Sequence, residues 1–401
     1  MFVLAVLAVA PLMIAIYAYV GYPAILWSVS RARNRSDMPS GEREPSTAKL
    51  PNVTITVPVY NAAASIRTTL EGLTALEYPR ERLQLLVLSD ASTDGTDDIV
   101  REFAARGVEL LRAPERRGKT AAENAALTAA RGEIIVNVDG TVIVPPGSLK
   151  RLVGVFADPT IGVASGRDVS IGPKHRENNG AESSYVGYEM WVRDLETIAG
   201  SIVGASGCFY GIRRRIHEQP LPPELSWDFA SPLVAKKLGY RSVSVSAAIC
   251  MVPRTPGIKA EVRRKVRTMA RGIRTLFYCR AMMNPFRYGG FAMMLLSHKL
   301  LRWLPYLLAP MSLVALGLMA TQRIIALILF VILTVVIACG LTGLRYPRLS
   351  HVRAVAGAAF IVGVFAAGFL AWWDVLRGVR MSTWDPTARP HAGAPRVMSA
   401  G

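Results

Sequence analysis

The feature that most constrains this sequence is its first thirty residues, which contain no charged side chain. At about 1.5 Å per residue, an apolar helix of this length can cross a bilayer. A cleaved signal peptide would instead start with positive charge and have a shorter apolar core. Arg31, Arg33 and Arg35 follow directly, and arginines favour the cytoplasmic side. The sequence therefore predicts a retained anchor at residues 1–30 whose end faces the cytoplasm.

A second apolar region, residues 293–373, predicts about three further spans. The candidate spans are Leu301–Met319, Ile324–Leu341 and Ala354–Trp373. The first two are joined by a turn at residues 321–323, and three arginines precede the third, which places that loop in the cytoplasm. The arginines of the tail would then lie outside, against the same rule. A re-entrant or interfacial segment that returns the tail to the cytoplasm is the alternative.

Residues 31–50 are polar and read as a linker, and the pattern then changes over residues 51–254. Short β-branched runs alternate there with helical stretches, which predicts an α/β domain with a mostly parallel, helix-covered sheet. The expected strands are Val53–Val59, Leu85–Ser89, Val108–Leu111 and Glu133–Val138. The expected helices between them are Ala63–Leu76, Gly95–Ala105 and Ala121–Ala130. Ligands of such sheets bind at the carboxyl ends of the strands.

The positive charge is concentrated next to the second apolar region. The net charge is +18, and residues 254–290 hold ten lysines and arginines but a single acid, Glu261. Arg264, Arg267, Arg271 and Arg274 would share one helix face, opposite an apolar face. We expect basic interfacial helices over residues 255–297, membrane helices over residues 298–373 and a polar tail over residues 374–401. Because the charge adjoins membrane spans and no nucleic-acid motif is present, a nucleic-acid partner is not expected.

Other classes of protein are excluded by composition. A chain that is 51% apolar is not disordered, and 33 glycines with 25 prolines argue against a coiled coil. The cysteines and histidines are scattered, without the spacing of a disulfide framework or a zinc site. The four cysteines are Cys208, Cys250, Cys279 and Cys339.

Acidic residues end two of the expected strands. Asp90 follows the second strand and Asp139 follows the fourth. Each alone is typical of a turn or a helix cap, but two carboxylates at one sheet edge can bind a nucleobase N–H or a hard cation. Residues 118–120 match the end of a phosphate-binding Walker motif, yet Ala113 stands where its first glycine is required. Lys119, before a helix start, can still donate to a phosphate.

Five sequence blocks resemble the inverting family 2 glycosyltransferases of GT-A fold, especially membrane-embedded bacterial polysaccharide synthases. The blocks are VPVYNAAASI, LSDASTDGTDDIV, RRGKTAAENAAL, IIVNVDGTVIVPPGSL and SWDFASPLVAKKLGYR. The basic EVRRKVRTMARGI and then SHKLLRWLP follow. The resemblance covers residues 51–303, with an anchor before it and spans after it. It implies a Rossmann-like GT-A domain in the cytosol between transmembrane helices.

The resemblance also implies roles for individual residues. Asp228 matches the catalytic base, Asp90 the acid that pairs with uracil, and Asp139 the first carboxylate of the DxD motif. Asp139 would thereby help hold Mg²⁺ or Mn²⁺ on the sugar diphosphate. The residues that match nucleotide-sugar-binding positions are Pro58, Tyr60, Asn61, Asp90, Lys119, Asn124, Asp139, Arg267 and Arg271.

The sequence departs from the family pattern at three places. Thr141 stands at the second DxD position, where an acid is usual, and Trp227 replaces an acid before Asp228. The stretch VRTMARGI stands where processive synthases carry QxxRW. These changes predict weaker binding of the cation and argue against long-chain processivity.

The expected protein is thus a hexosyl- or N-acetylhexosaminyltransferase of the bacterial inner membrane with a cytosolic catalytic domain. It would transfer a sugar with inversion from a UDP-sugar, with a divalent cation, to a cell-envelope or extracellular glycan. The implied partners are a glycan or lipid-linked acceptor, membrane lipids and polysaccharide export proteins. The alternatives are a polyprenyl-phosphate sugar transferase and a catalytically inactive scaffold of a polysaccharide assembly complex.

Overall fold

The computed structural model describes residues 1–33, 50–171, 180–253, 258–380 and 382–383. These residues fall into two compact units. The α/β unit comprises residues 30–33, 50–171, 182–253 and 382–383, and the helical unit comprises residues 1–29, 180–181 and 258–380. Each unit is described by itself below.

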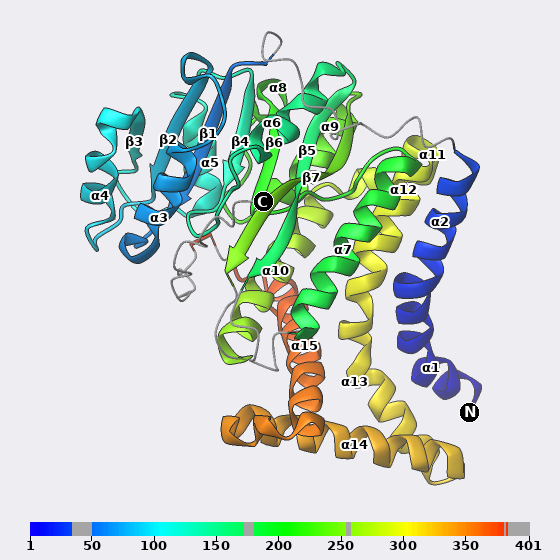
Figure 1. Cartoon of the computed structure of the whole chain (residues 1–401). Helices are drawn as coiled ribbons and strands as arrows, with labels where there is room; N and C mark the ends of the chain where they lie inside the picture. Colours follow the sequence, from blue (N-terminus) through cyan, green and yellow to red (C-terminus); the bar gives the residue numbers. More distant parts are fainter. Residues whose placement is uncertain (34–49, 172–179, 254–257, 381, 384–401) are drawn as a thin grey trace, which may run out of the picture. The chain divides into compact units, whose positions relative to one another are not determined.

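The α/β unit is built on a seven-stranded sheet in the order β3-β2-β1-β4-β6-β5-β7 (Figure 1). Its strands are β1 Val53–Val59, β2 Leu83–Ser89, β3 Val108–Arg112, β4 Ile134–Val138, β5 Ile161–Ile171, β6 Phe209–Arg213 and β7 Arg241–Pro253. Strand β6 runs antiparallel to both of its neighbours, and the other four pairings are parallel. The predicted fold class, a mostly parallel α/β sheet, is confirmed.

Helices cover both faces of this sheet. They are α3 Ala63–Thr74, α4 Thr96–Glu102, α5 Lys119–Ala126, α6 Ser148–Gly154, α7 Gly180–Ala199, α8 Arg214–His217 and α9 Trp227–Lys237. Every residue of β1 is buried, as expected for a central strand with helices on each side. Neighbouring β2 divides its side chains between two cores, with Leu85 and Val87 in one and Leu86 and Leu88 in the other.

Three helix predictions in this unit were too long, and the first, Ala63–Leu76, was so by two residues. The stretch Gly95–Ala105 divides into α4 and a 3₁₀ turn, Ala104–Arg106. The stretch Ala121–Ala130 is helical only to Ala126, because the chain turns there toward β4 and Arg131 donates its backbone N–H to the Gln84 and Thr54 side chains instead. Side chains of the neighbouring strands β1 and β2 thus end the helix. The sequence pattern around the helix holds no information about these distant residues.

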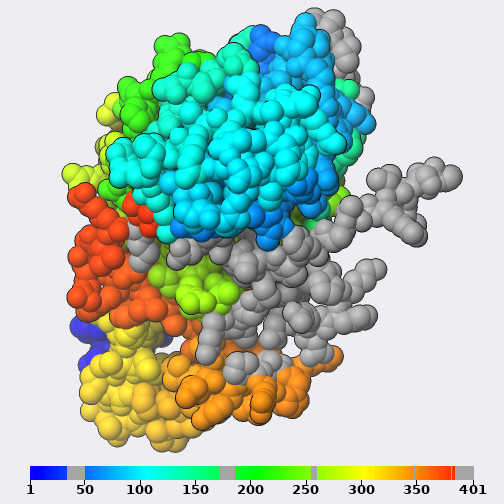
Figure 2. All heavy atoms as spheres, turned by 90° about the vertical axis from the view of Figure 1, so that its left-hand side faces the viewer, coloured from blue at the N-terminus to red at the C-terminus, as the bar shows by residue number. Residues whose placement is uncertain are grey.

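Within the described residues, four helices are long and apolar enough to cross a membrane, and all but the last three residues of the first belong to the helical unit. The candidate spans are Phe2–Ala32, Gly290–Ala320, Ile324–Arg345 and Arg353–Leu376. They contain α1 Phe2–Ile16 and α2 Tyr22–Ala32, then α12 Gly290–Leu295 and α13 Leu301–Ala320, and finally α14 Ile324–Arg345 and α15 Arg353–Leu376. Large apolar side chains along α14, orange in Figure 2, are exposed to the outside. That is the arrangement expected of a helix in lipid.

Two of these spans contain a π-helical segment. The segment η1, Tyr17–Gly21, joins α1 to α2, and η9, Leu296–Leu300, joins α12 to α13. The Tyr17 hydroxyl lies 2.9 Å from the Ser297 hydroxyl, which links the two segments. The π-helical segment of the first span therefore lies beside that of the second.

The basic stretch forms one long helix, α10 Ile258–Tyr278. As the spacing predicts, its apolar residues share a face. Ala270 and Ile273 pack in a core with Ala371 and Trp372 of α15. This part of the apolar face is therefore covered by protein, and the interfacial position of the helix remains a prediction.

Candidate active site

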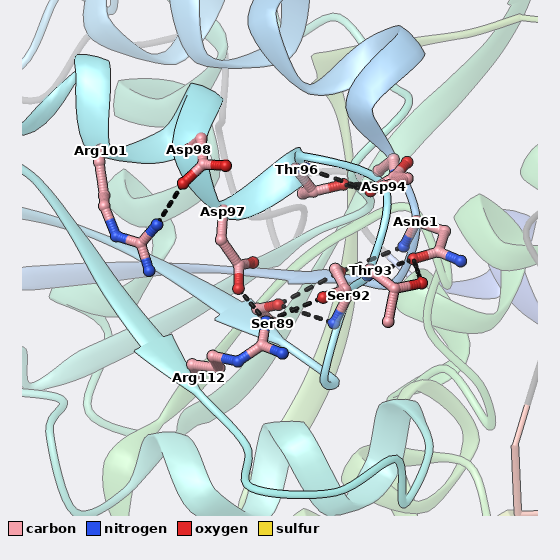
Figure 3. A network of polar contacts seen from close by, with 11 residues as sticks. Asn61, Ser89, Ser92, Thr93, Asp94, Thr96, Asp97, Asp98, Arg101 and Arg112 are labelled. Carbon is pink, nitrogen blue, oxygen red and sulfur yellow. Dashed lines mark hydrogen bonds and ion pairs between the residues drawn. The ribbon is translucent and has the colours of Figure 1, made fainter.

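The turns after β1 and β2 are joined by a network of polar contacts (Figure 3). Asn61 adopts a left-handed backbone, with φ of 46°, which asparagine tolerates better than most residues. Its side-chain oxygen accepts from the Thr93 backbone N–H at 2.8 Å, and its own N–H donates to Ser92 at 3.2 Å. The structure thus brings the first two strand ends together, and the Asn61 side chain holds them.

Asp94 strengthens the same network. Its carboxylate accepts from the Ala63 backbone at 3.0 Å and from the Thr96 backbone at 3.1 Å. Burial by itself would raise the pKa of Asp94, but the hydrogen bonds from Thr96 and Ala63 hold that pKa below its usual value. Farther along, Asp97 pairs with Arg112 of β3. These contacts give the loops beside the sheet edge a fixed shape.

Asp90 ends β2 and connects it to the loop before α5. It is fully buried, and its two carboxylate oxygens accept from the backbone N–H groups of Arg117 and Gly118 at 2.7 and 2.8 Å. Gly118 has φ of +95°, and a Cβ there would lie 1.9 Å from the Ser382 carbonyl oxygen. In this structure Asp90 therefore binds the backbone of the loop before α5. Its pairing with a nucleobase remains a prediction.

Lys119 and Asp139 meet at the end of β4. The Lys119 ammonium lies 2.6 Å from Asp139 Oδ1 and 3.9 Å from Glu123 Oε1, and it donates to the Gly207 carbonyl at 3.2 Å. Burial alone would lower the pKa of Lys119, but the carboxylates of Asp139, Glu123 and Asp228 raise it above its usual value. The lysine therefore carries a fixed positive charge among these acids.

Asp228 stands in the first turn of α9. Its carboxylate accepts from the Ser226 hydroxyl, and its backbone carbonyl accepts from the Ala205 N–H at 2.9 Å. Gly207 lies so close that a Cβ on it would be 2.9 Å from Asp228 Oδ2. Asp228 is only half-buried as a residue, and a general base must lie within hydrogen-bond reach of the proton that it takes.

Asp168 on β5 is an acidic residue near this cluster that the sequence analysis did not select. It accepts from the Ser206 hydroxyl at 2.6 Å. Burial raises the pKa of Asp168, Arg193 and Ser206 oppose this, and the charges of Asp139 and Asp228 add to the rise. Asp168 lies within a long strand, where it pairs with Cys250 of β7, and in no strand-end motif, so only its hydrogen bond with Ser206 shows that it belongs beside the cluster.

Comparison with known proteins identifies the domain that carries these residues. The sequence model of the family named glycosyl transferase family 2 matches residues 54–220 of this chain. Residues 54–220 form a family 2 glycosyltransferase domain. Asp228 lies just beyond the matched residues, and the rest of the cluster lies within them.

Relatives of the family 2 domain include named glycosyltransferases. Glycosyltransferase AglE of Haloferax volcanii is 35% identical over 96 residues, which are 23% of this chain and 32% of AglE. A beta-monoglucosyldiacylglycerol synthase of Synechocystis is 32% identical over 121 residues, which are 29% of this chain and 25% of that enzyme. The matched segments thus span about a third or less of these relatives.

A solved structure shares the fold over nearly the whole chain. The mannosyltransferase PcManGT from Pyrobaculum calidifontis, in complex with GDP-Man and Mn²⁺, has a TM-score of 0.66 and 23% sequence identity. The match covers 94% of this chain and 100% of that one. The predicted GT-A fold is confirmed for the family 2 domain.

Several predicted site residues have other observed contacts in this domain. The Asn124 amide donates to the Leu221 carbonyl at 2.7 Å, and its oxygen accepts from Trp227 Nε1 at 2.8 Å. Tyr60 lies beneath the Arg116 guanidinium, 3.8 Å from the ring centre. Pro58 is buried within β1. Contacts of these three residues with a nucleotide remain predictions.

The two predicted arginines belong to the other unit. Arg267 and Arg271 lie on α10, and Arg271 is buried there. Their contact with a diphosphate therefore also remains a prediction. The structure brings together Lys119, Asp139 and Asp228 of the predicted site residues, and it adds Asp168 and Glu123.

A divalent cation is compatible with this cluster through Asp139. Among the described residues, no three His, Cys, Asp or Glu side chains are grouped to hold a metal ion. Mg²⁺, however, is commonly bound by one or two protein carboxylates together with substrate phosphates and water. The Asp139 carboxylate is a ligand of that hard type, and Lys119 pairs with it in this structure.

Proposed function

We propose that this chain is an integral membrane glycosyltransferase that transfers a sugar, with inversion, from a UDP-sugar to a glycan or lipid-linked acceptor. The observation that carries the proposal is the position of Asp228 beside the Lys119–Asp139 pair in a family 2 domain. A base and a fixed cation are the two groups that displacement of a nucleoside diphosphate requires.

In the proposed reaction, the acceptor hydroxyl gives its proton to Asp228 as its oxygen attacks the anomeric carbon of the sugar. The bond from that carbon to the diphosphate oxygen breaks, and its electron pair leaves with the nucleoside diphosphate. Lys119 stabilises the negative charge that develops on the leaving group. Ser226 orients the Asp228 carboxylate by its hydrogen bond. Attack from the side opposite the leaving group inverts the anomeric centre.

The proposal includes Mg²⁺ or Mn²⁺ held by Asp139. Such an ion, when bound, would neutralise charge on the diphosphate. Asp139 would then share its oxygens between the ion and Lys119, while Thr141 supplies no second carboxylate.

Because Thr141 supplies no second carboxylate, we expect half-maximal activity to need a higher Mn²⁺ concentration than it would with an acid at that position. Thr141→Asp adds a carboxylate and should lower the half-saturating Mn²⁺ concentration by about tenfold, whereas Thr141→Asn adds no charge and should change it little. Nucleotide release measured over a Mn²⁺ titration checks this. Full activity in excess chelator would contradict the assignment.

The four apolar helices and the arginines that follow the first one support a location in the bacterial inner membrane, with the family 2 domain in the cytosol. A relative named as a glycolipid synthase and another named as a succinoglycan biosynthesis protein support a lipid-linked or glycan acceptor. Polysaccharide export proteins would be partners of a glycan product.

The decisive experiment is a nucleotide-release screen of the purified full chain in detergent with Mn²⁺ and membrane lipid extract. The donors are UDP-glucose, UDP-galactose, UDP-N-acetylglucosamine and GDP-mannose. We expect release with at least one UDP-sugar. Product that partitions into organic solvent would favour the polyprenyl-phosphate alternative, and no release with any donor would favour the inactive scaffold.

The substitution Asp228→Asn tests the proposed base, because it removes the carboxylate charge and keeps the size of the side chain. It should lower turnover by about 10²- to 10⁴-fold and leave binding of the donor intact. Asp194→Asn, an aspartate of α7 that bonds Ser246, is the control and should keep full activity. Turnover retained by Asp228→Asn would refute the role of the base.

A further inference from the structure

The four-residue segment 205–208 contacts each of the three central residues of the candidate site. The Ala205 N–H donates to the Asp228 carbonyl at 2.9 Å, and the Gly207 carbonyl accepts from Lys119 at 3.2 Å. The Cys208 carbonyl accepts from the Asp139 N–H at 3.1 Å. The geometry of base, lysine and metal-side carboxylate therefore depends on where this segment lies.

Ser206 fixes the segment through both its backbone and its side chain. Its N–H donates to Ser165 Oγ at 2.8 Å, and its hydroxyl donates to Asp168 Oδ1 at 2.6 Å. The same hydroxyl accepts from the Cys208 N–H at 3.1 Å. Ser206 is almost fully buried, with 1% of its surface exposed. A buried hydroxyl held between a carboxylate and an amide has one orientation, so it transmits the position of β5 to the segment.

We propose that Asp168 and Ser206 act together as positioning residues that hold segment 205–208 against Asp228. This rests on the proposed function of Asp228 as the base. The charge-assisted hydrogen bond from Ser206 to Asp168 sets where Gly207 lies, and Gly207 sets the limit of movement of the Asp228 carboxylate. Asp168 acts through Ser206 and is not itself assigned a contact with substrate.

The test compares Asp168→Ala, Ser206→Ala and the double variant in the nucleotide-release assay with the full chain. Each single change should lower kcat by about 10- to 100-fold, since a displacement near 1 Å can cost that much. The KM for the donor should stay within about threefold, because Lys119 keeps its contacts with Asp139 and Glu123. The double variant should lose no more than either single one, because both remove the same bond.

Conservative variants separate positioning from a merely structural role. Asp168→Asn keeps an oxygen that can accept from Ser206, and it should return kcat to within about threefold of the parent. Asp194→Ala breaks a similar Ser–Asp bond, 2.8 Å long, with Ser246, and should not change kcat. Single variants within about twofold of the parent, or losses that multiply in the double variant, would overturn the proposal.

A second measurement does not depend on finding the donor. Hydrogen exchange of the peptide covering residues 204–209 should speed up in Asp168→Ala and Ser206→Ala but not in Asp194→Ala. Unchanged protection would overturn the proposal even if no sugar were transferred. If the parent protein releases no nucleotide while exchange responds as expected, the proposed function fails and the coupling of Asp168 to the segment stands.

Discussion

Gly207 is the residue whose small size matters most for Asp228. Its backbone is held by Lys119, and an added Cβ would lie 2.9 Å from Asp228 Oδ2. The far end of the aspartate would give way before the backbone does. Gly207→Ala should therefore move the carboxylate and lower kcat by about 100-fold, with little change in stability.

Steady-state kinetics and thermal unfolding of the same preparation check this expectation. Gly72→Ala is the control, because a Cβ there meets open space on α3, and it should leave kcat unchanged. A Gly207→Ala protein with the parental kcat would show that the added Cβ does not displace the Asp228 carboxylate from its working position.

His217 makes stability depend on pH. It is fully buried on α8, its ring centre lies 4.1 Å from that of Trp227, and burial lowers its pKa to about 4. An unfolded histidine titrates near 6.5. Between these values the unfolded chain binds the proton and the folded chain does not. Stability is therefore complete above pH ~6.5 and falls as pH drops toward 4, by up to about 3 kcal/mol.

Thermal unfolding in detergent from pH 7.5 to pH 4.5 measures this dependence. His217→Phe should flatten the curve over that interval, whereas His351→Gln, at an exposed position, should not. Equal slopes for the parent and His217→Phe would show that other groups cause the loss.

At this scale, the sequence predicted the acids and the lysine better than it predicted their neighbours. Asp139, Lys119 and Asp228 lie in recognisable blocks, and the structure brings them together. Asp168 and Gly207 could not be found in this way, because their importance depends on a long-range hydrogen bond with Ser206 and on a close backbone approach to Asp228. Asn124 matched a block, yet its described contacts are with Leu221 and Trp227.

At the level of elements, Asn124 connects α5 to α9. Removing its side chain leaves the indole N–H of Trp227 and the backbone of Leu221 without their hydrogen bonds. An unmet buried polar group costs about 1–3 kcal/mol. Asn124→Ala should lower the unfolding temperature and reduce kcat, because the start of α9 carries Asp228.

Thermal unfolding and donor-binding measurements distinguish this expectation from the predicted nucleotide contact. Thr128→Ala, just after α5 and exposed, is the control for loss of a local hydrogen bond. A variant that binds the donor weakly but unfolds at the parental temperature would favour the nucleotide contact.

The limits of prediction for elements have a physical cause. Strand β1 was predicted with its observed bounds, because six of its seven residues, all except Pro58, are β-branched. Strand β6 was not predicted, because its five residues, FYGIR, include a glycine and an arginine and show no regular alternation. Its antiparallel direction follows only from its pairing with β4 and β5.

At the level of the whole molecule, the four apolar helices predict an integral membrane protein. The last two apolar helices were expected to within about four residues of their bounds, because hydropathy is a local property of the sequence, whereas the helix expected from Leu301 begins at Gly290. The sequence predicted an α/β domain separate from the apolar helices, but that the N-terminal helices form one compact unit with the C-terminal ones depends on long-range contacts that a local pattern does not contain. The protein should remain in the membrane fraction after an alkaline carbonate wash and leave it only with detergent. Release by carbonate alone would show peripheral attachment.

The paired π-helical segments constrain how the first two spans can vary. Each α-helical residue turns the chain by about 100°, so one residue removed from η1 would rotate the helix on one side of it relative to the other. The Tyr17–Ser297 contact between η1 and η9 would then separate. A one-residue deletion in η1 would therefore need a compensating change in η9 to keep the Tyr17–Ser297 contact.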